Sequence, residues 1–437
     1  MTPLRKTSLL ANSAVLLLTL AVVLSGVPVR GDEPAKWLQG ELESLMALYG
    51  HLHANPELSL HEEQTAKRVA GELRALGIEV TTGVGGHGVV GVLHNGDGKT
   101  LLIRTDMDAL PVVEQTGLPF ASKVRVPHPD GEGQVGVMHA CGHDLHMTNF
   151  IGVARYLATH KNLWKGTILF VAQPAEEKGL GARAMLEHGL YRRFGHPDCV
   201  IALHVASNLP AGLIGYRKGY ALANVDSCDI TLFGRGGHGA FPHTTIDPIV
   251  QAAQLVLALQ TIVAREVDPV ESAVISVGSI QAGTKHNIIP DRCHLQATIR
   301  SYSPKVREQL KQAIKRKAKG IAASMGAAEP QVQFSEGLPA VYNDPALVDR
   351  VVPAMQKVLG KERVVEVPPV MGAEDFALYR SPKTPIFMFW LGSVDRERLA
   401  KMNSPVSLHS PFYYPDARPA LQTGVPAMIA AALELLK

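Results

Sequence analysis

The sequence is poor in cysteine, in aromatic side chains and in net charge. Four cysteines in 437 residues are too few for a disulfide-stapled scaffold. The formal charge is +3, but Arg5, Lys6 and Arg30 lie in a segment that we expect to be removed. Without them 40 Lys and Arg balance 40 Asp and Glu. The mature chain therefore lacks the basic excess of nucleic-acid-binding proteins, and no nucleic-acid partner is expected.

Long hydrophobic runs are also absent, except near the N-terminus. Arg5 and Lys6 precede an apolar run of 11 residues from Ala14 to Leu24, followed by small residues and Pro28. This order is typical of a secretory signal, and the run is shorter than the ~20 residues of a transmembrane helix. Residues 1–31 therefore predict a signal peptide and an exported protein, periplasmic or secreted. An uncleaved membrane anchor is the alternative; no stable membrane insertion is expected once the signal is removed.

From Trp37 onward, helical and strand patterns alternate. Leucines at helical spacing predict a helix from Trp37 to Leu52, and a second pattern predicts one from Glu62 to Leu76. The further expected elements are strands Val89–Leu93, Leu101–Thr105, Thr167–Val171 and Val200–Leu203, and helices Phe150–Leu157 and Ala182–Leu186. This alternation predicts an α/β layer on a largely parallel sheet.

The pattern changes near residue 223 and changes back near residue 337. Between these points the expected elements are strands Asp229–Phe233, Ala273–Ile280 and Leu295–Ile299, with helices at about 247–265 and 304–324. Helix 346–359, strand 384–390 and helix 418–436 then follow. We therefore predict an α/β catalytic domain in two pieces, residues 32–222 and 337–437, with an α+β domain, residues 223–336, inserted between them.

Acidic residues gather where predicted strands end, which is where open α/β sheets bind ligands. Asp106 and Asp108 follow one strand and point to the same side of an extended chain. Glu176 and Glu177 follow another, and their adjacent carboxylates point in different directions. One carboxylate can therefore bind a metal while its neighbour moves a proton. Taken alone, each pair is also compatible with capping acids or an acidic loop.

Histidine and cysteine form a second cluster. His139, Cys141, His143 and His146 fall within eight residues, and Gly142 gives the backbone freedom for its two neighbours to meet one ion. A buried free cysteine beside capping histidines is the alternative, and a structural zinc site is disfavoured because no CxxC partner follows.

Two isolated histidines extend this set. His204 ends a predicted strand, and His409 lies late in the chain. Neither is a ligand candidate alone, but with Cys141, His143 and Glu177 they complete a mixed sulfur, nitrogen and oxygen set suited to transition metals.

With these residues in view, the chain resembles the metal-dependent amidohydrolase branch of the aminoacylase and carboxypeptidase superfamily, which includes hippurate hydrolases, N-acetyl-diaminopimelate deacetylases and auxin-conjugate amidohydrolases. The match covers nearly everything after residue 36. It rests on the ordered motifs at Leu52–Ser59, Asp106–Pro111, His139–Asp144, Gln173–Glu177, Gly236–Ala240, His286–Pro290 and Gly372–Phe376. The resemblance implies a two-domain metallopeptidase-like fold, whose inserted domain serves as lid and dimerisation domain.

The resemblance also implies roles for single residues. The implied ligands of two divalent transition-metal ions per subunit are Cys141, His143, Glu177, His204 and His409. Glu176 is the implied general acid and base, and Asp108 orients a ligand histidine. His238 is expected to reach the scissile carbonyl, often across a dimer, while Asn287 and Arg300 bind the substrate carboxylate. Gly239 stands where the family usually has alanine, a change not expected to alter the chemistry.

These roles predict hydrolysis of N-acyl amino acids to a carboxylic acid and a free amino acid. The expected metals are zinc or manganese, and cobalt or nickel would also suit the ligand set. A homodimer is expected. One alternative is an exopeptidase of the same superfamily, acting as a carboxypeptidase or dipeptidase. A second is a binding protein without activity, and a third is a hydrolase that uses Cys141 as its nucleophile.

Overall fold

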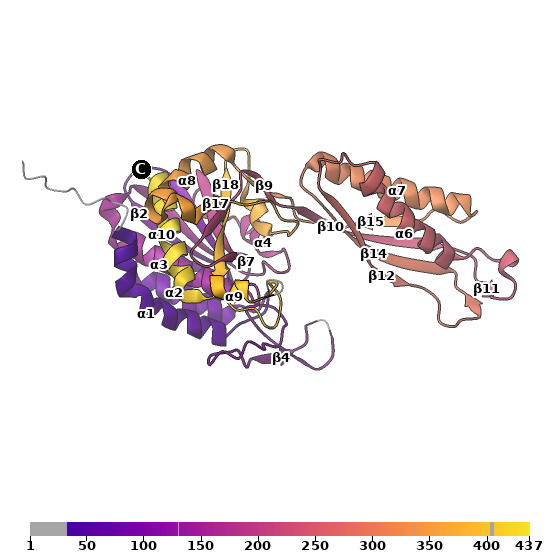
Figure 1. Ribbon diagram of the computed structural model, residues 1–437, viewed down its shortest axis with the longest axis horizontal. Coiled ribbons are helices and arrows are strands. Elements are labelled where there is room, and N and C mark those ends of the chain that lie inside the picture. Colours follow the sequence, from indigo (N-terminus) through magenta and orange to yellow (C-terminus); the bar gives the residue numbers. More distant parts are fainter. Residues whose placement is uncertain (1–32, 130, 336, 403–405) are drawn as a thin grey trace, which may run out of the picture.

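The computed structural model describes residues 33–129, 131–335, 337–402 and 406–437. The predicted signal peptide, residues 1–31, lies outside the described residues. The described chain forms two lobes of unequal size (Figure 1). The chain leaves the larger lobe through β10 (Asn224–Phe233) and returns to it after β15 (Gln331–Phe334).

The larger lobe is built on a sheet of eight strands in the order β1-β2-β6-β3-β7-β18-β8-β17. Their bounds are β1 Glu79–Thr82, β2 Val89–Asn95, β3 Thr100–Asp106, β6 Gly166–Gln173, β7 Cys199–Pro210, β8 Ile214–Tyr216, β17 Val364–Glu366 and β18 Ile386–Val394. The four central strands, β6 to β18, are mutually parallel. β1, β2 and β8 make antiparallel pairs. The sheet is therefore largely parallel, as predicted, and its antiparallel pairs lie outside the four central strands, where a short turn such as that from β1 to β2 permits only antiparallel pairing.

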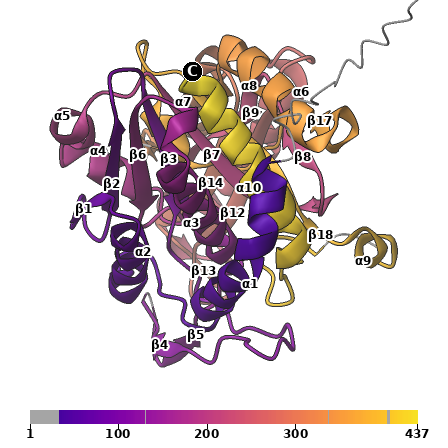
Figure 2. The same cartoon turned by 90° about the vertical axis from the view of Figure 1, so that its left-hand side faces the viewer.

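Helices cover both faces of this sheet. Figure 2 shows α1 (Glu33–Ala54), α3 (His143–Thr159) and α10 (Ala417–Leu435) packed over one face. α2 (Glu63–Ala75) and α8 (Pro345–Leu359) flank them, and α4 (Gly181–Glu187) and α5 (Leu190–Phe194) lie on the other face. Strand side chains alternate between the two cores: Leu101 and Ile103 face α3, while Leu102 faces α4.

The smaller lobe is an antiparallel sheet in the order β12-β14-β10-β15, with α6 (Pro248–Arg265) and α7 (Pro304–Ser324) packed on it. β12 spans Ala273–Gln281 and β14 spans Arg292–Ser301. Both helices begin with a side-chain cap, Asp247 or Ser303, followed by proline in the first turn. The short pair β11 (Gly237–His238) and β13 (Ile288–Ile289) lies at the far tip (Figure 1).

The remaining elements are short. They are β4 Arg125–Pro127, β5 Gln134–Gly136, β9 Gly219–Leu222, β16 Val341–Asn343, α9 Arg396–Ala400, and four 3₁₀ turns at Lys161–Leu163, Pro242–Thr244, Lys361–Arg363 and Asp375–Tyr379. β9 pairs with β16 where the chain passes between the lobes.

Helix α6 leaves an apolar face uncovered. Leu255, Leu259 and Ile262 are buried against the sheet, whereas Val250 and Leu257 are 45% and 71% exposed. Within the described residues, α6 is the one helix whose length and composition would suit a membrane span, which the sequence analysis did not anticipate. β12 is an edge strand beside it, pairing only with β14 among the described strands. An exposed apolar helix face beside an open strand edge is typical of an association surface.

Candidate metal centre and active site

The candidate site forms where central parallel strands end. β3 ends at Asp106 and leads to Asp108, β6 leads to Glu176 and Glu177, and β7 carries His204. Because β6, β3 and β7 are parallel neighbours, their carboxyl ends meet at one edge. The sheet thus brings together side chains that are up to about a hundred residues apart in the sequence.

Cys141 and His143 reach this edge from a tight turn. His143 is the first residue of α3, and Gly142 before it has φ = 78°. A Cβ at Gly142 would lie 2.8 Å from Val205 Cγ2, so both the conformation and the space require glycine. The glycine that the sequence analysis singled out therefore orients the two side chains beside it.

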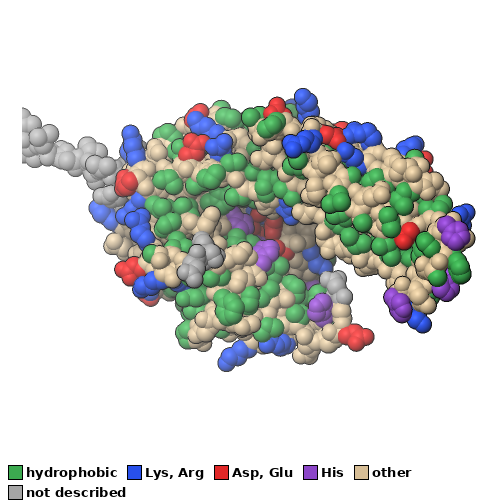
Figure 3. Space-filling view, turned by 45° about the vertical axis from the view of Figure 1, so that its right-hand side comes forward, with side chains coloured by type: hydrophobic (Ala, Val, Ile, Leu, Met, Phe, Trp, Pro, Cys, Tyr) green, Lys and Arg blue, Asp and Glu red, His purple; other side chains and the backbone are tan. Residues whose placement is uncertain are grey.

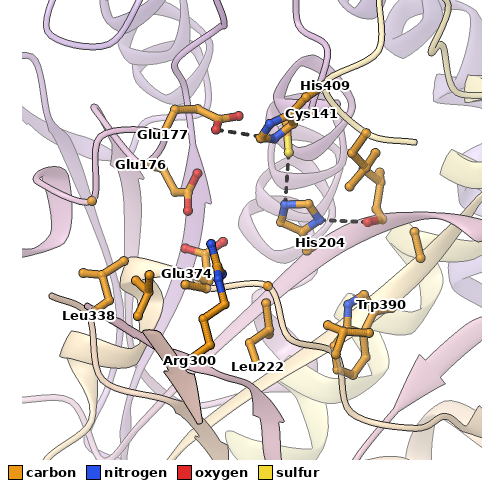
Figure 4. Close-up of a pocket in the computed structure, with 18 of the residues that line it drawn as sticks. Cys141, Glu176, Glu177, His204, Leu222, Arg300, Leu338, Glu374, Trp390 and His409 are labelled. Carbon is orange, nitrogen blue, oxygen red and sulfur yellow. Dashed lines mark hydrogen bonds and ion pairs between the residues drawn. The ribbon is translucent and has the colours of Figure 1, made fainter. Parts of the chain in front are cut away.

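The predicted ligands converge in two overlapping groups. Within each group the ligand atoms lie within 4.8 Å of one another: Cys141, His143 and His204 in the first, and Cys141, Glu177 and His409 in the second. The Cys141 Sγ atom is 3.6 Å from His204 Nε2, and Glu177 Oε2 is 3.5 Å from His409 Nε2 (Figure 4). Cys141 belongs to both groups, so its thiolate could serve an ion held by either of them.

The histidine tautomers also suit metal binding. The Nδ1 atoms of His143 and His204 each lie 2.8 Å from a backbone carbonyl, of Asp108 and Val205 respectively. A carbonyl only accepts, so each Nδ1 carries the hydrogen and each Nε2 directs a lone pair at the centre. Burial, followed by the neighbouring His146, lowers the pKa of His204 to about 3, so its imidazole is neutral.

Buried polar atoms without a hydrogen-bond partner also indicate that these residues suit a metal ion. Among the described residues, His143 Nε2 and Glu177 Oε1 are buried without a hydrogen-bond partner, although they are 3.9 Å apart. Buried polar atoms are normally paired. Two unpaired atoms at this separation therefore indicate that a bound ion or molecule belongs between them. Burial raises the pKa of Glu177 to about 7 and that of the Cys141 thiol well above its usual range. Bound cations would reverse both shifts, and the residues fit two divalent metals.

His146 forms a further buried group with Asp106 and His143, but its ring nitrogens already have partners within the protein. His146 Nε2 accepts from the Val205 N–H at 2.9 Å, and its Nδ1 lies 2.7 Å from Asp106 Oδ1. Both ring nitrogens are thus engaged. His139 is 2% exposed and stands in none of the ligand groups.

Asp108 supports the centre in more than one way. Its backbone carbonyl, rather than its carboxylate, takes the short bond from His143 Nδ1; the carboxylate Oδ1 is 3.4 Å away. The other oxygen, Oδ2, accepts from Ser59 Oγ at 2.6 Å and from the Glu177 N–H at 2.9 Å. The residue therefore orients His143 and also fixes the backbone of Glu177.

Glu176 and Glu177 diverge because of the residue before them. Ala175 has φ = 50°, a left-handed conformation that costs an L-residue about 1 kcal/mol. Its N–H donates to the buried carboxylate of Glu62 at 2.7 Å, and its carbonyl accepts from Leu180 and Gly181. Burial raises the pKa of Glu176 well above its usual range, helped by nearby Glu374. Glu176 is thus suited to hold a proton.

A buried ion cluster beneath Glu176 escaped the sequence analysis. Arg104 donates to Asp106 at 2.6 Å, to Glu374 at 2.8 Å and to Asp375 at 3.2 Å. The available signal was an arginine directly after three apolar residues of a predicted strand, since a buried arginine requires buried partners. The motif containing Glu374 was noted, but no role was attached to it.

The site opens into a cavity of about 1080 Å³ between the two lobes. Figure 3 shows the hollow, with acidic and histidine side chains at its floor. The smaller lobe contributes Val225 and Arg300, whose Nη1 donates to the Met371 carbonyl at 2.9 Å. Arg300 therefore lies where a substrate carboxylate is expected.

His238 and Asn287 lie elsewhere. Both are exposed, they lie next to each other at the β11–β13 strand pair at the tip of the smaller lobe, and neither lines this cavity. The Gly239 N–H donates to the Asn287 carbonyl at 2.9 Å, and a Cβ at Gly239 would lie 3.2 Å from that oxygen. The structure does not bring these two residues to the site of their own chain.

Comparisons with known proteins agree with this architecture. The sequence matches the family model described as peptidase family M20/M25/M40 over residues 102–410. Thermostable carboxypeptidase 2 of Saccharolobus solfataricus is 42% identical over 352 residues, 79% of this chain and 85% of that protein. The N-acetylcysteine deacetylase of Bacillus subtilis is 38% identical over 349 residues, 78% of this chain and 86% of that protein. A solved structure from Bacillus subtilis, described as a dinuclear metal binding peptidase from the M20 family, has a TM-score of 0.75 at 32% identity and covers 91% of this chain and 99% of its own.

Proposed function

Because this chain belongs to peptidase family M20/M25/M40 and is an amide-bond hydrolase, we propose that it cleaves N-acyl amino acids with the help of two divalent transition-metal ions. The membership confirms the family resemblance and the two-domain α/β fold predicted from the motifs. The single observation that carries the proposal is Cys141, which is shared by two overlapping ligand groups beside the buried carboxyl of Glu176.

The metals would be held by Cys141, His143, Glu177, His204 and His409. When bound, two such ions supply a Lewis acid that polarises an amide carbonyl and makes water acidic near neutral pH. Zinc and manganese suit this ligand set best, and cobalt or nickel would also be accepted.

Glu176 is the proposed proton carrier. Its carboxylate takes a proton from the attacking water and delivers it to the nitrogen of the leaving amine. Burial, followed by the nearby Glu374 carboxylate, favours the protonated form, which is the form needed in the second step. Asp108 keeps His143 and Glu177 in place and takes no proton itself.

Arg300 is proposed to bind the carboxylate of the amino acid. Its guanidinium lies in the cavity and has a planar fork suited to a carboxylate. His238 and Asn287 would complete the site from a partner subunit, since their own chain leaves them exposed at the far tip. The uncovered face of α6 and the open edge of β12 support a homodimer through the smaller lobe.

An exopeptidase is the second candidate, because a relative at 42% identity is named a carboxypeptidase. The test is a panel of N-acyl amino acids and dipeptides, given to enzyme reconstituted with zinc, manganese or cobalt. We expect hydrolysis of N-acyl amino acids, its loss after exhaustive chelation and its return with metal. Faster cleavage of dipeptides would favour the exopeptidase, and full activity without metal would favour Cys141 as a nucleophile and overturn the proposal.

A further inference from the structure

The cavity has a charged end, where Leu338 also lies near Glu176, and an apolar end around Trp390 on the other side of the candidate metal centre. Glu176, Glu374 and Arg300 lie on one side (Figure 4). Trp390 lies on the other, beyond His204. Nothing in the proposed chemistry uses the apolar end.

The apolar end is a wall supported by the sheet. Trp390 on β18 pairs with His204 on β7 and with Gly215 on β8. A Cβ on Gly215 would meet Val367 Cγ1 at 3.0 Å and Leu209 Cδ2 at 3.3 Å, so these two side chains converge over the glycine. Trp390, Leu209 and Val367 all line the cavity.

The wall is also held in place. Trp390 is 7% exposed, and the Val367 N–H donates to the Tyr216 carbonyl at 2.9 Å. Leu209 and Val367 are half-buried and pack against the core of the larger lobe. A preformed apolar surface of this kind binds apolar groups with little loss of side-chain entropy, because its own side chains are already ordered.

The position of Glu176 decides which part of the substrate meets this wall. The residue that protonates the leaving nitrogen must face that nitrogen, so the amino acid lies on the side of Glu176 and Arg300. The acyl group then extends to the opposite side of the carbonyl carbon, past His204. We propose that Leu209, Val367 and Trp390 form an acyl subsite that selects bulky apolar acyl groups, aromatic or medium-chain, over acetyl. This inference rests on the proposed function.

The test is a series of N-acyl-L-alanines in which only the acyl group changes: acetyl, butanoyl, hexanoyl and phenylacetyl. A constant amino acid keeps the leaving group and its contact with Arg300 the same. We expect kcat/KM to rise from acetyl to hexanoyl and phenylacetyl by roughly 10- to 100-fold, as for burial of several methylene groups.

Substitutions in the wall test whether it causes the acyl-group preference. In Val367→Phe the larger side chain occupies the space of the proposed acyl subsite. The ratio of kcat/KM for the hexanoyl substrate to that for the acetyl substrate should therefore fall about tenfold or more. Val365→Phe is the matched control, since Val365 is also half-buried but does not line the cavity, and it should keep the wild-type ratio. If Val367→Phe fails to fold, Leu209→Ala should lower the same ratio by removing apolar contact.

The outcomes separate the inference from the function on which it rests. A wild-type preference for acetyl, or a Val367→Phe ratio equal to that of the wild type, overturns the acyl subsite and leaves N-acyl amino acid hydrolysis intact. A variant that changes selectivity among amino acids instead of acyl groups assigns the wall to the amino acid side chain and also overturns it. If the metal-loaded enzyme cleaves none of the series and none of the wider panel, the proposed function itself fails.

Discussion

His53 is predicted to carry a positive charge in the core of the larger lobe. The side chain is 1% exposed, and its ring lies between two carboxylates: Nδ1 donates to Asp144 at 2.7 Å and Nε2 donates to Glu114 at 2.9 Å. Burial disfavours the charged imidazolium, but these two carboxylates outweigh burial and raise the pKa to about 10. Asp144 follows His143, a proposed metal ligand. The three side chains, which we call the His53 clamp, therefore join α1, the loop that carries Glu114 and the start of α3.

The consequence is a loss of stability at alkaline pH. The pKa of His53 is 6.5 in the unfolded chain and about 10 in the folded one. The stabilisation is therefore fully present below pH 6.5 and is lost as the pH rises through 10. At ~1.36 kcal/mol for each pKa unit, the clamp loses about 3 to 4 kcal/mol between pH 6.5 and 9.5. That is a large part of the ~5–15 kcal/mol that keeps a typical domain folded.

The assay is denaturant unfolding of the metal-free protein across that pH range, compared with His53→Gln. The variant leaves two buried carboxylates without their cation, so it should lose roughly 3–5 kcal/mol near pH 6.5. The two stabilities should approach each other towards pH 9.5, because the stabilisation from protonating His53 shrinks as the pH nears its folded-state pKa of about 10. His51→Gln is the control, since His51 is exposed on the same helix. Parallel curves for wild type and His53→Gln would refute a charged His53.

Three further predictions concern the site and the N-terminus. Glu176→Gln should keep metal and fold but lose ~10²–10⁴-fold in kcat, whereas Glu177→Gln should lose metal by elemental analysis; the opposite pattern reverses the two roles. Glu176→Gln and His238→Ala, unfolded, mixed equally and refolded, should regain roughly a quarter of wild-type activity if sites are shared in a dimer, and background activity rejects sharing. N-terminal sequencing of the mature protein should begin between about residues 26 and 32, and an intact Met1 argues against cleavage.

Much of the site could be predicted because its chemistry is local in the sequence. The motif around Glu177 follows an apolar strand that the hydrophobic period alone reveals, and the motif around Cys141 directly precedes a helix. Central parallel strands then bring their carboxyl ends together without further information. The two single histidines, His204 and His409, needed the resemblance, because one histidine has no pattern of its own.

What the sequence could not show depends on pairing between distant segments. The antiparallel margins of the large sheet follow from which strands meet, and hydrophobic period does not specify partners. Arg104 has three acidic partners, two of them some 270 residues away in the chain, and nothing local in the sequence names them. The orientation of the Asp108 carboxylate was missed for the same reason, since Ser59 and the Glu177 N–H reach it from separate segments.

The directions of the adjacent carboxylates of Glu176 and Glu177 depend on a residue far away in the sequence. Two neighbouring carboxylates have separate roles only if the backbone between them turns, and the turn begins at Ala175 in a conformation that alanine disfavours. Glu62, more than a hundred residues earlier, holds that N–H from a fully buried position. Its other carboxylate oxygen has no partner among the described residues, and burial raises its pKa to about 7. Such strain persists only where the surroundings fix it, and here they fix the direction of both Glu176 and Glu177. The separate proposed roles of Glu176 and Glu177 therefore depend on the distant contact with Glu62 as well as on the local sequence.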